Sequence, residues 1–521
     1  MYAGIRNYNR LAYLGLIIVL VLPLISGCAS SGVTETPSAS AVGGAAGPTS
    51  TTGGGIIGET PTAAAIETPT TAAVETPTTA ATSAISPTTA ATGTVAPTET
   101  VMPTTAVTGT ATITASMAIS GTLAPGSIRM SVVRGAMIDT MRKLAQQYEA
   151  ANPGKKVYIE EEPEGGAFEA LIAAGNQPDI ITASFGSQIG SLASEGAVLP
   201  LDDLPGMQDL LNRLDPATYE KLYGHYFYIP AGTDVTMLIY NKDLFQEAGL
   251  DPNKPPTTFA EYLDYAQKIQ ALPARSNGDK VYGNVFWNDA LAWGGWYWNM
   301  LQPMYLNANQ DACLLLNKLG TDIVFDQPEC KMAEFFDFNA KAQQYAPPTM
   351  EKNFFSRSIG MWPQYGYSWE PNLKEALNQP MVIGQDVGIA PVPVPNAGDT
   401  AYSTLGGRAF MIMKTNPQRQ QDAWQFVQYL MQDDNNLVFL KELGYLPVIE
   451  TLKSDTYFQD PTRQPFVEML KTSVLPQQYD AADKAANAIL GVYQKVAVER
   501  TMTPQEGVTA AAKDARSALG Q

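Results

Sequence analysis

Apolar and polar positions from residue 126 onward change repeatedly between the period of a strand and that of a helix. Residues 128–133, IRMSVV, predict a buried strand, and the helix after it has an apolar face of Met137, Met141, Leu144, Ala145 and Tyr148. Further strands are predicted at 156–159 and 179–182, each followed by a helix, one around Phe168, Leu171 and Ile172 and one around Ile189 and Leu192. Strands that alternate with helices indicate an α/β fold, with a mostly parallel sheet covered by helices on both faces.

The most informative local pattern lies at residues 237–269. An apolar strand at 237–240 leads into a short helix, which we expect to end at Gly249 because glycine tolerates a left-handed backbone. After a Pro-rich loop, Thr258 and Glu261 have the spacing of a capping box, which predicts the start of a second helix. The buried face of that helix is predicted to consist of Phe259, Tyr262, Leu263, Ala266 and Ile269.

The string YNKDLFQEAGL at 240–250, with the Pro/Thr-rich loop after it, closely resembles the signature of the family 1 extracellular solute-binding proteins. These are the sugar-capturing subunits of bacterial ABC importers, and the maltose-binding protein is among them. Further segments that resemble elements of this family lie within 126–450, at 177–204, 386–413, 422–430 and 444–448.

The resemblance implies an α/β fold of the two-lobe periplasmic-binding-protein kind (type II), with the lobes joined by hinge crossovers and the ligand in the interlobe cleft. Carried over to this sequence, lobe 1 comprises about 126–235 and 394–432, and lobe 2 about 236–393 and 433–521. The hinge segments are expected near 232–238 and 386–395.

The N-terminus has the features of an export signal, predicted at 1–28. Two arginines precede an apolar run at 11–25, which is shorter than the roughly 20 residues that a membrane-spanning helix needs. Ile25-Ser26-Gly27-Cys28 looks like a bacterial lipobox, with Cys28 as the lipid attachment site. We therefore expect a lipoprotein that is anchored in the cell membrane and faces the extracytoplasmic side. The alternative is a plain secretory signal with an incidental cysteine.

Residues 29–125 are almost entirely Thr, Ala, Pro, Ser and Gly, and an eight-residue unit recurs between Glu59 and Thr82. This segment has too few bulky apolar side chains to offset the entropy of ordering, so we expect a disordered stalk. A solenoid is the alternative meaning of the repeat, but a short unit without large side chains cannot build a core. As a coil, the stalk would reach roughly 50–60 Å.

The net charge of the chain argues against some classes of binding partner. The chain carries 51 acidic and 33 basic residues, a net charge of −18. Nucleic acid or anionic lipid would need a basic face, so neither is expected as a partner. The sequence has neither a P-loop nor a nucleophile elbow, and its single histidine, His225, is expected to be structural or on the surface. We expect no catalytic residues, no cofactor and no metal.

Two cysteines remain besides Cys28. Cys313 and Cys330 form an even pair in an exported domain and enclose two short apolar runs around a glycine turn. We expect a disulfide that closes this loop and contributes about 3 kcal/mol in the chain-entropy model. The alternative is two buried free thiols.

Aromatic side chains are concentrated in two Gly-rich segments, WNDALAWGGWYW at 287–298 and GMWPQYGYSW at 360–369. Sugar rings have apolar C–H faces that stack on aromatic planes, so aromatic area with a few polar groups is expected of a carbohydrate cleft. A place in the core is the alternative for any single ring, but the two segments look too loop-like to be wholly core. The predicted cleft aromatics are Trp293, Trp296, Tyr367 and Trp369.

Other cleft contacts are expected in loops that follow parallel strands, where such sheets bind ligands, and at positions that the family resemblance implies. The candidates are Arg134, Phe185, Ser187, Asp234, Asp289, and the turn Gly406-Gly407-Arg408. The alternative role of Asp289 is that of a helix N-cap. The alternative role of the glycine turn is that of a turn at the start of a strand. The loop 183–188 does not keep the charged and aromatic side chains with which the maltose-binding protein contacts its ligand, which argues against maltose itself.

We therefore expect a monomeric, lipid-anchored solute-binding subunit that closes its lobes on a sugar or oligosaccharide. It would deliver this carbohydrate to the transmembrane subunits of an ABC permease. One alternative is a non-sugar solute, such as glycerol phosphate or a polyamine; a phosphate would require basic cleft residues, for which Arg134, Arg357 and Arg408 are the obvious candidates. A sensory receptor is a second alternative, and a stalked extracellular hydrolase is a less favoured third.

Overall fold

The structure is a computed structural model that describes residues 123–163, 167–285, 290–348, 354–365 and 381–521. Of residues 290–297 and 364–365 it describes the backbone only. The predicted signal segment with Cys28 and nearly all of the predicted stalk lie outside these ranges. Within the ranges, no helix combines the length and the apolar character needed to cross a membrane.

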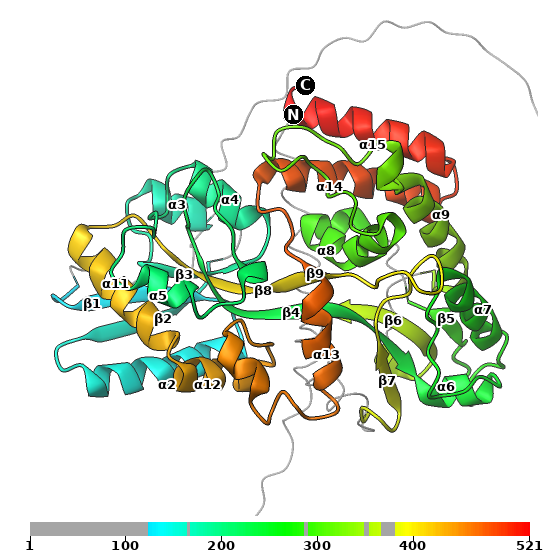
Figure 1. Cartoon of the computed structure of the whole chain (residues 1–521), viewed down its shortest axis with the longest axis horizontal. Helices are drawn as coiled ribbons and strands as arrows, with labels where there is room; N and C mark the ends of the chain where they lie inside the picture. Colours follow the sequence, from blue (N-terminus) through cyan, green and yellow to red (C-terminus); the bar gives the residue numbers. More distant parts are fainter. Residues whose placement is uncertain (1–122, 164–166, 286–289, 349–353, 366–380) are drawn as a thin grey trace, which may run out of the picture. The chain divides into compact units, whose positions relative to one another are not determined.

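Nine strands of the described residues form one sheet. They are β1 (Ser127–Val132), β2 (Lys156–Glu161), β3 (Ile180–Ser184), β4 (Ile229–Asn241), β5 (Tyr282–Asn284), β6 (Ile359–Tyr365), β7 (Val387–Ala390), β8 (Ser403–Ile412) and β9 (Ser473–Val474). The strand order is β2-β1-β3-β8-β4-β6-β5, with β7 also paired to β4 and β9 to β8. Figure 1 shows β4 and β8 as the long strands at the centre of this order.

The sheet is mixed, so the prediction of a mostly parallel sheet is wrong. Strand β1 runs parallel to β2 and β3, as a series of strand–helix–strand units requires. Strand β8, however, is antiparallel to both β3 and β4, and β4 is antiparallel to β6 and β7. The reason is that β4 and β8 carry the chain across the sheet in opposite directions, which local periodicity does not reveal.

The described helices cover both faces of the sheet (Figure 1). They are α2 (Ala136–Ala151), α3 (Ala167–Ala173), α4 (Ser187–Ser194), α5 (Met207–Leu211), α6 (Lys242–Glu247), α7 (Phe259–Gln270), α8 (Ala290–Asn309), α9 (Met332–Ala342), α11 (Pro417–Leu430), α12 (Asp433–Leu443), α13 (Gln464–Met469), α14 (Asp480–Tyr493) and α15 (Pro504–Leu519). Helices α14 and α15 pack against each other, and they also pack against α8 and α9 respectively.

Most of the predicted local signals are confirmed. The apolar face predicted for α2 is buried along its length. Helix α7 begins with the predicted capping box, in which Thr258 accepts from the Glu261 backbone and the Glu261 side chain accepts in return. Gly249, just after α6, has a φ of 72°, the left-handed conformation expected there. Residues 237–240, predicted as a strand, form the end of the longer β4.

Buried apolar side chains form two clusters. The first contains the buried side chains of β1, β3, α2 and α11. The second contains the buried side chains of α7, α8, α9, α14 and α15. Phe439, Val448 and Phe466 belong to the first cluster, and the second resumes only at Ala482. The chain therefore returns to the second group of elements near residue 480, whereas the family resemblance places that return at 433.

Three segments connect the two groups of elements. Within β4, Val235 pairs with Leu405 of β8, while Thr236 already pairs with Tyr365 of β6. The second connection is 391–402, between β7 and β8, and the third is 475–479, between β9 and α14. The second is fastened to α8 by Asn307, whose side chain donates to Val392 and Pro393 and accepts from the Tyr402 backbone.

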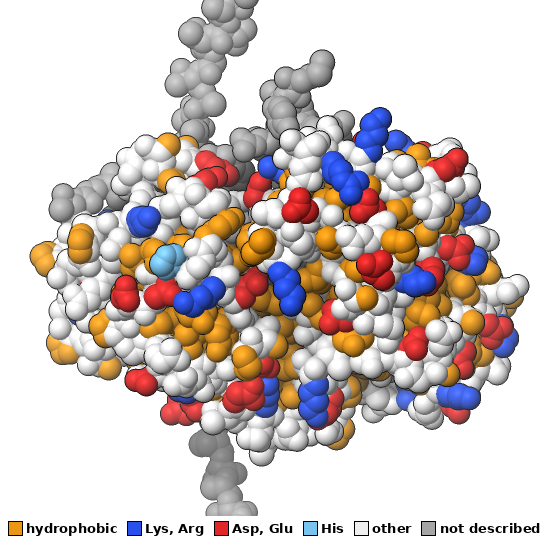
Figure 2. Space-filling model, turned by 45° about the horizontal axis from the view of Figure 1, so that its top comes forward, with side chains coloured by type: hydrophobic (Ala, Val, Ile, Leu, Met, Phe, Trp, Pro, Cys, Tyr) orange, Lys and Arg blue, Asp and Glu red, His pale blue; other side chains and the backbone are white. Residues whose placement is uncertain are grey.

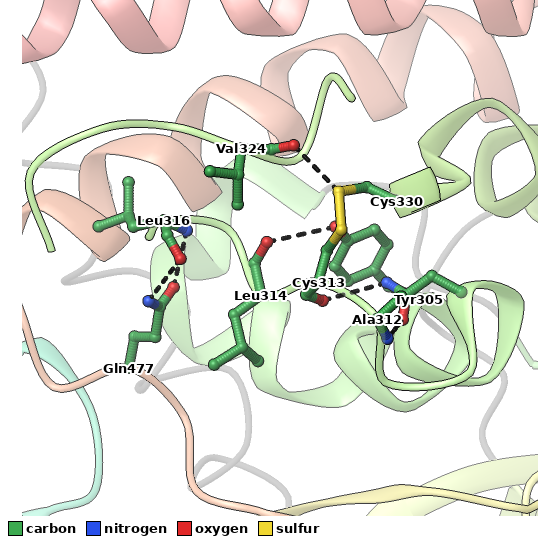
Figure 3. Close-up of a disulfide and its surroundings, with 9 residues drawn as sticks. Tyr305, Ala312, Cys313, Leu314, Leu316, Val324, Cys330 and Gln477 are labelled. Atoms are coloured by element: carbon green, nitrogen blue, oxygen red, sulfur yellow. Dashed lines mark hydrogen bonds between the residues drawn. A yellow bond between two sulfur atoms is a disulfide. The ribbon is translucent and has the colours of Figure 1, made fainter. Parts of the chain in front are cut away.

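The predicted disulfide between Cys313 and Cys330 is confirmed, with Cα atoms 5.2 Å apart (Figure 3). It closes a loop in which Leu316 forms a bridge with Ile323, so the two apolar runs do fold back on each other. Tyr305 of α8 donates from its hydroxyl to the Leu314 carbonyl at 3.3 Å, which attaches the loop to that helix. The loop is therefore held at its base and on one side.

Candidate functional site

A cavity of about 230 Å³ lies where elements of both apolar clusters meet. One wall is the loop 184–188, which joins β3 to α4. The opposite wall comes from α8, α14 and the disulfide loop, and the segment 476–477 completes the lining. Apart from residues 184–188, the described lining residues are Trp298, Asn299, Gln302, Leu315, Pro476, Gln477, Ala482, Asp483 and Ala486.

The loop 184–188 is placed by the end of β3, as the rule for ligand sites in such sheets anticipates. Phe185 is buried, with its ring 6.1 Å from that of Tyr228. Gly186 precedes the first turn of α4 with a φ of 133°, which favours glycine. Its backbone N–H donates to the Gln478 side chain at 2.8 Å. The loop is therefore fixed by contacts from outside its own strand and helix.

Helix α8 contributes Trp298 and Gln302, which are four residues apart and so lie on the same face. Trp298 packs against the rings of Tyr305 and Phe335, and 4% of it is exposed. Gln302 is 3% exposed, and its Oε1 has no hydrogen-bond partner among the described residues. An unpaired buried acceptor costs about 1–3 kcal/mol. A hydroxyl or N–H of a bound molecule would supply the missing donor.

Three charged or ionisable groups lie near the loop 184–188: Arg408, which pairs with Ser184, and Glu162 and Asp234, which interact with Arg408. Burial raises the pKa of the Glu162 carboxyl, and the charge of Arg408 and the nearby Gln188 side chain oppose this rise. Asp234 is fully buried in β4, and its two carboxylate oxygens lack hydrogen-bond partners within the described part of the chain. Burial raises the pKa of Asp234 to about 8, against the opposing charge of Arg408. At neutral pH, Asp234 is therefore mostly protonated.

The described lining of the cavity has one ionisable side chain, Asp483 in the first turn of α14. Burial raises its pKa, the charge of Asp480 adds to this effect, and a hydrogen bond with Asn487 opposes it. The other polar lining groups are hydroxyls and carboxamides. Lys, Arg and His are missing from the lining as far as the structure describes it. The described part of the lining thus offers donors and acceptors without positive charge.

The structure brings two of the predicted site residues to the cavity, Phe185 and Ser187. It does not bring Asp234 there, which is fully buried in β4, nor Gly406, Gly407 and Arg408, which lie in β8. Arg134 is exposed and forms an ion pair with Glu161 at the end of β2. Trp293 and Trp296 lie in α8, where their side chains are not described, and Asp289, Tyr367 and Trp369 lie outside the described residues.

The predicted glycine turn at 406–408 is wrong, because these residues are inside β8. Gly407 pairs with Thr233 of β4 and has a φ of 126°. A Cβ there would lie 2.2 Å from the Gly232 carbonyl oxygen. The glycine therefore allows two strand backbones to approach closely, at a position where β4 is irregular.

The interpretation of 287–298 as loop-like is also wrong for residues 290–298, since α8 begins at Ala290. The helical spacing of Trp298 and Gln302 could have identified them as one face. Gln477 and Asp483 had no such signal, because they reach the cavity only through the packing of the C-terminal segment. His225 is on the surface, hydrogen-bonded to Asp202 at 3.1 Å, as expected. Groups of three or more metal-ligating side chains are absent from the described residues.

Residues 134–437, more than half of the chain, match the family model described as bacterial extracellular solute-binding protein. The sn-glycerol-3-phosphate-binding periplasmic protein of Brucella melitensis is 26% identical over 430 residues, covering 73% of this chain and 92% of that protein. The maltotriose-binding protein of Pyrococcus abyssi is 25% identical over 332 residues, covering 61% of this chain and 65% of that protein.

Among solved structures, the cyclic alpha-maltosyl-1,6-maltose binding protein from Arthrobacter globiformis superposes with a TM-score of 0.64 at 18% identity. The match covers 76% of this chain and 99% of that protein. This likeness confirms the predicted α/β fold with two lobes. The cavity lies between the two groups of elements that correspond to those lobes.

Proposed function

The chain belongs to the bacterial extracellular solute-binding protein family, and we propose that it captures a neutral sugar or oligosaccharide for an ABC importer. The cavity between the loop 184–188 and α8 and α14 is the proposed binding site. The ligand would be passed to the transmembrane subunits of the permease. No bond is made or broken in this proposal, so the site needs no catalytic residue.

The observation that carries the proposal is the chemistry of the cavity lining. Trp298 contributes an aromatic ring to the lining, and Gln188, Asn299, Gln302 and Gln477 contribute carboxamides. A sugar presents apolar C–H faces and many hydroxyls, each of which can donate and accept a hydrogen bond. The unpaired Oε1 of Gln302 is a buried acceptor that such a hydroxyl would satisfy.

The charges favour a neutral solute over a phosphate. Asp483 lines the cavity, and Glu162 is close to the lining residue Gln188, so both would repel an anion when ionised. Arg408, one of the basic residues that a phosphate site would need, is outside the described lining and interacts with Glu162 and Asp234. Figure 2 shows basic and acidic side chains interspersed over one face of the molecule, without a basic patch. The relatives include both a maltotriose-binding and a glycerol-phosphate-binding protein, and the lining favours the first kind of ligand.

Capture would proceed by closure of the two lobes on the ligand. The three connecting segments, at Val235–Thr236, 391–402 and 475–479, are where a hinge motion would be absorbed. A ligand favours the closed form only through contacts with both walls. In the proposal, Ser187 on one wall and Gln302 on the other make such contacts, since both line the cavity.

The proposed cellular location of the protein is based on its N-terminal sequence. Lipidation at Cys28 would anchor the chain in the cell membrane, and the stalk would carry the binding domain away from the surface. The monomeric state is part of the same proposal. Labelling of cells with a fatty-acid analogue would test the anchor, and a Cys28→Ser chain that still incorporates the label would contradict it.

Thermal unfolding in the presence of solutes tests the proposed ligand class. The panel contains glucose, maltose, maltotriose, glycerol 3-phosphate and spermidine, each at millimolar concentration. A ligand at 100 times its dissociation constant stabilises the folded state by about 2.7 kcal/mol, so a cognate saccharide is expected to raise the Tm by several degrees. Stabilisation by glycerol 3-phosphate or spermidine, with none by any saccharide, would overturn the proposal.

A further inference from the structure

Two consecutive glutamines, Gln477 and Gln478, lie in the segment that connects β9 to α14. Their side chains bond to opposite walls of the cavity, one to the disulfide loop and the other to the loop 184–188. The connecting segment 475–479 is thus in contact with both lobes, next to the proposed ligand site.

Gln477 is bonded to the disulfide loop by three hydrogen bonds to its backbone. The side-chain Oε1 accepts from the Leu316 N–H at 2.9 Å, and Nε2 donates to the carbonyls of Leu316 and Asn317 at 3.0 and 3.3 Å. Figure 3 shows Gln477 facing Leu316, with the Cys313–Cys330 bond on the other side of the loop. Leu315, next to the bonded residue, lines the cavity. Gln477 therefore holds the backbone directly after a wall-forming residue.

Gln478 bonds to the opposite wall. It is fully buried, its Oε1 accepts from the Gly186 N–H at 2.8 Å, and its Nε2 donates to the Pro476 carbonyl at 2.7 Å. Gly186 lines the cavity. Helix α4 lies against the same segment, since a Cβ at Gly190 would be only 1.8 Å from the Gln478 carbonyl oxygen. Both the side chain and the backbone of Gln478 thus set the position of the lobe 1 wall.

The disulfide bears on the same wall as Gln477. It closes the loop three residues before Leu316, in a stretch that is also held by the Tyr305 bond to Leu314, the Val324 backbone bond to Leu315 and the bonds to Gln477. Tyr479 continues the contact, because its ring lies against Gly320 of the loop and meets the Tyr223 ring edge-on at 5.8 Å. A change at the disulfide would therefore reach the cavity through the residues that Gln477 holds.

We propose that Gln477 and Gln478 form a two-sided clamp that positions both walls of the cavity, and that Gln477 couples the Cys313–Cys330 disulfide to ligand affinity. They act as positioning residues, and the proposal rests on the proposed function in that the cavity binds a saccharide. Gln477 also lines the cavity. A direct contact with the ligand is therefore the competing role that the test must separate from positioning.

Amide hydrogen exchange tests the clamp without any ligand. Gln477→Ala is expected to speed exchange at Leu316, and Gln478→Ala to speed exchange at Gly186, each by about three- to tenfold, the worth of one hydrogen bond. Gln478→Met keeps the buried volume if the alanine variant does not fold. Gln459→Ala is the matched control, because this exposed glutamine also donates to a backbone carbonyl, that of Lys453 at 2.9 Å. Unchanged exchange at Leu316 and Gly186 would overturn the clamp.

Calorimetric titration with maltotriose tests the coupling. Gln477→Ala and the pair Cys313→Ser with Cys330→Ser are each expected to weaken binding by about three- to tenfold. Because both act through one wall, the combined variant is expected to lose much less than the product of the two effects. Independent effects that multiply would assign Gln477 a direct contact and overturn the coupling. If wild-type chain binds neither maltotriose nor another saccharide of the panel, the proposed function fails, while hydrogen exchange still decides the clamp.

Discussion

Gln302 is the residue at which function and stability are expected to conflict most directly. Its Oε1 is buried and unpaired within the described part of the chain, so the folded protein bears a desolvation cost that a ligand would remove. Gln302→Leu removes the unpaired atom and nearly keeps the volume. We expect the Tm to stay the same or rise slightly, while saccharide affinity falls about tenfold, the effect of one hydrogen bond to a buried group.

Thermal unfolding and calorimetric titration of the same preparation measure both effects. Gln208→Leu is the control, because Gln208 is exposed on α5 and bonds only to Asn212 among the interactions described. Unchanged affinity in Gln302→Leu, or a large loss of stability, would show that Gln302 is a structural residue and not a contact of the ligand.

The buried carboxyl of Asp234 is expected to make the stability of the folded protein depend on pH. Burial raises its pKa from 3.8 to about 8. Between these values the folded state binds a proton that the unfolded state releases, so the free energy of unfolding falls as pH rises from about 4 to 8. Asp234→Asn removes this contribution. The variant is expected to be as stable as wild type near pH 4 and more stable by a few kcal/mol near pH 8.

Denaturant unfolding of both proteins at pH 4, 6 and 8 measures the difference. Other buried acids, such as Glu162 and Asp483, contribute to both curves and cancel in the comparison. A constant difference across this range would mean that Asp234 does not titrate there. A wild-type advantage that grows toward pH 8 would mean that it is ionised and paired.

Residue-level sequence reasoning found Phe185 and Ser187 because loops after parallel strands are general ligand positions. It did not find Gln302, because a lone glutamine in a helix carries no signal until the helix face is known. It could not find Gln477 either, since that residue comes to the cavity from a segment 161 positions away from its partner Leu316. Site residues that come together only through long-range packing could therefore not be predicted from single residues.

At the scale of elements, helix α4 and the segment 476–480 depend on each other. Gly190 is the point of closest approach, where an added Cβ would lie 1.8 Å from a backbone oxygen. Because backbone cannot move as easily as a side chain, Gly190→Ala is expected to cost about 1–3 kcal/mol of stability. The same displacement of α4 is expected to weaken saccharide binding.

Chemical denaturation measures the cost, with Ser194→Ala on the exposed face of the same helix as the control. Alanine is the better helix former at both positions. A Gly190→Ala chain as stable as Ser194→Ala would show that α4 and the segment are not in tight contact.

Individual helices and strands followed well from the sequence where the signal was local. The capping box at Thr258 and the apolar face of α2 are such cases, since both depend on spacing alone. The direction of β8 did not follow, because pairing with β3 and β4 is decided by how the chain crosses between lobes. The same holds for residues 433–470, whose apolar side chains complete the first cluster although the family resemblance assigned them to the second lobe.

For the whole molecule, the three connections and the cavity between them imply a motion. Ligand contacts on both walls are expected to close the lobes, so the radius of gyration in small-angle scattering should decrease on addition of a bound saccharide. Gln302→Leu at the same saccharide concentration should show a smaller change. A radius that stays constant while calorimetry reports saturation would contradict closure as the mechanism of capture.

The most direct test is a crystal structure of the chain with the saccharide of the panel that stabilises it most. The proposed function predicts one sugar ring between the loop 184–188 and α8, in contact with Trp298 and with a hydroxyl within hydrogen-bond distance of Gln302 Oε1. A saccharide bound elsewhere on the molecule, with this cavity empty or filled by protein side chains, would contradict it.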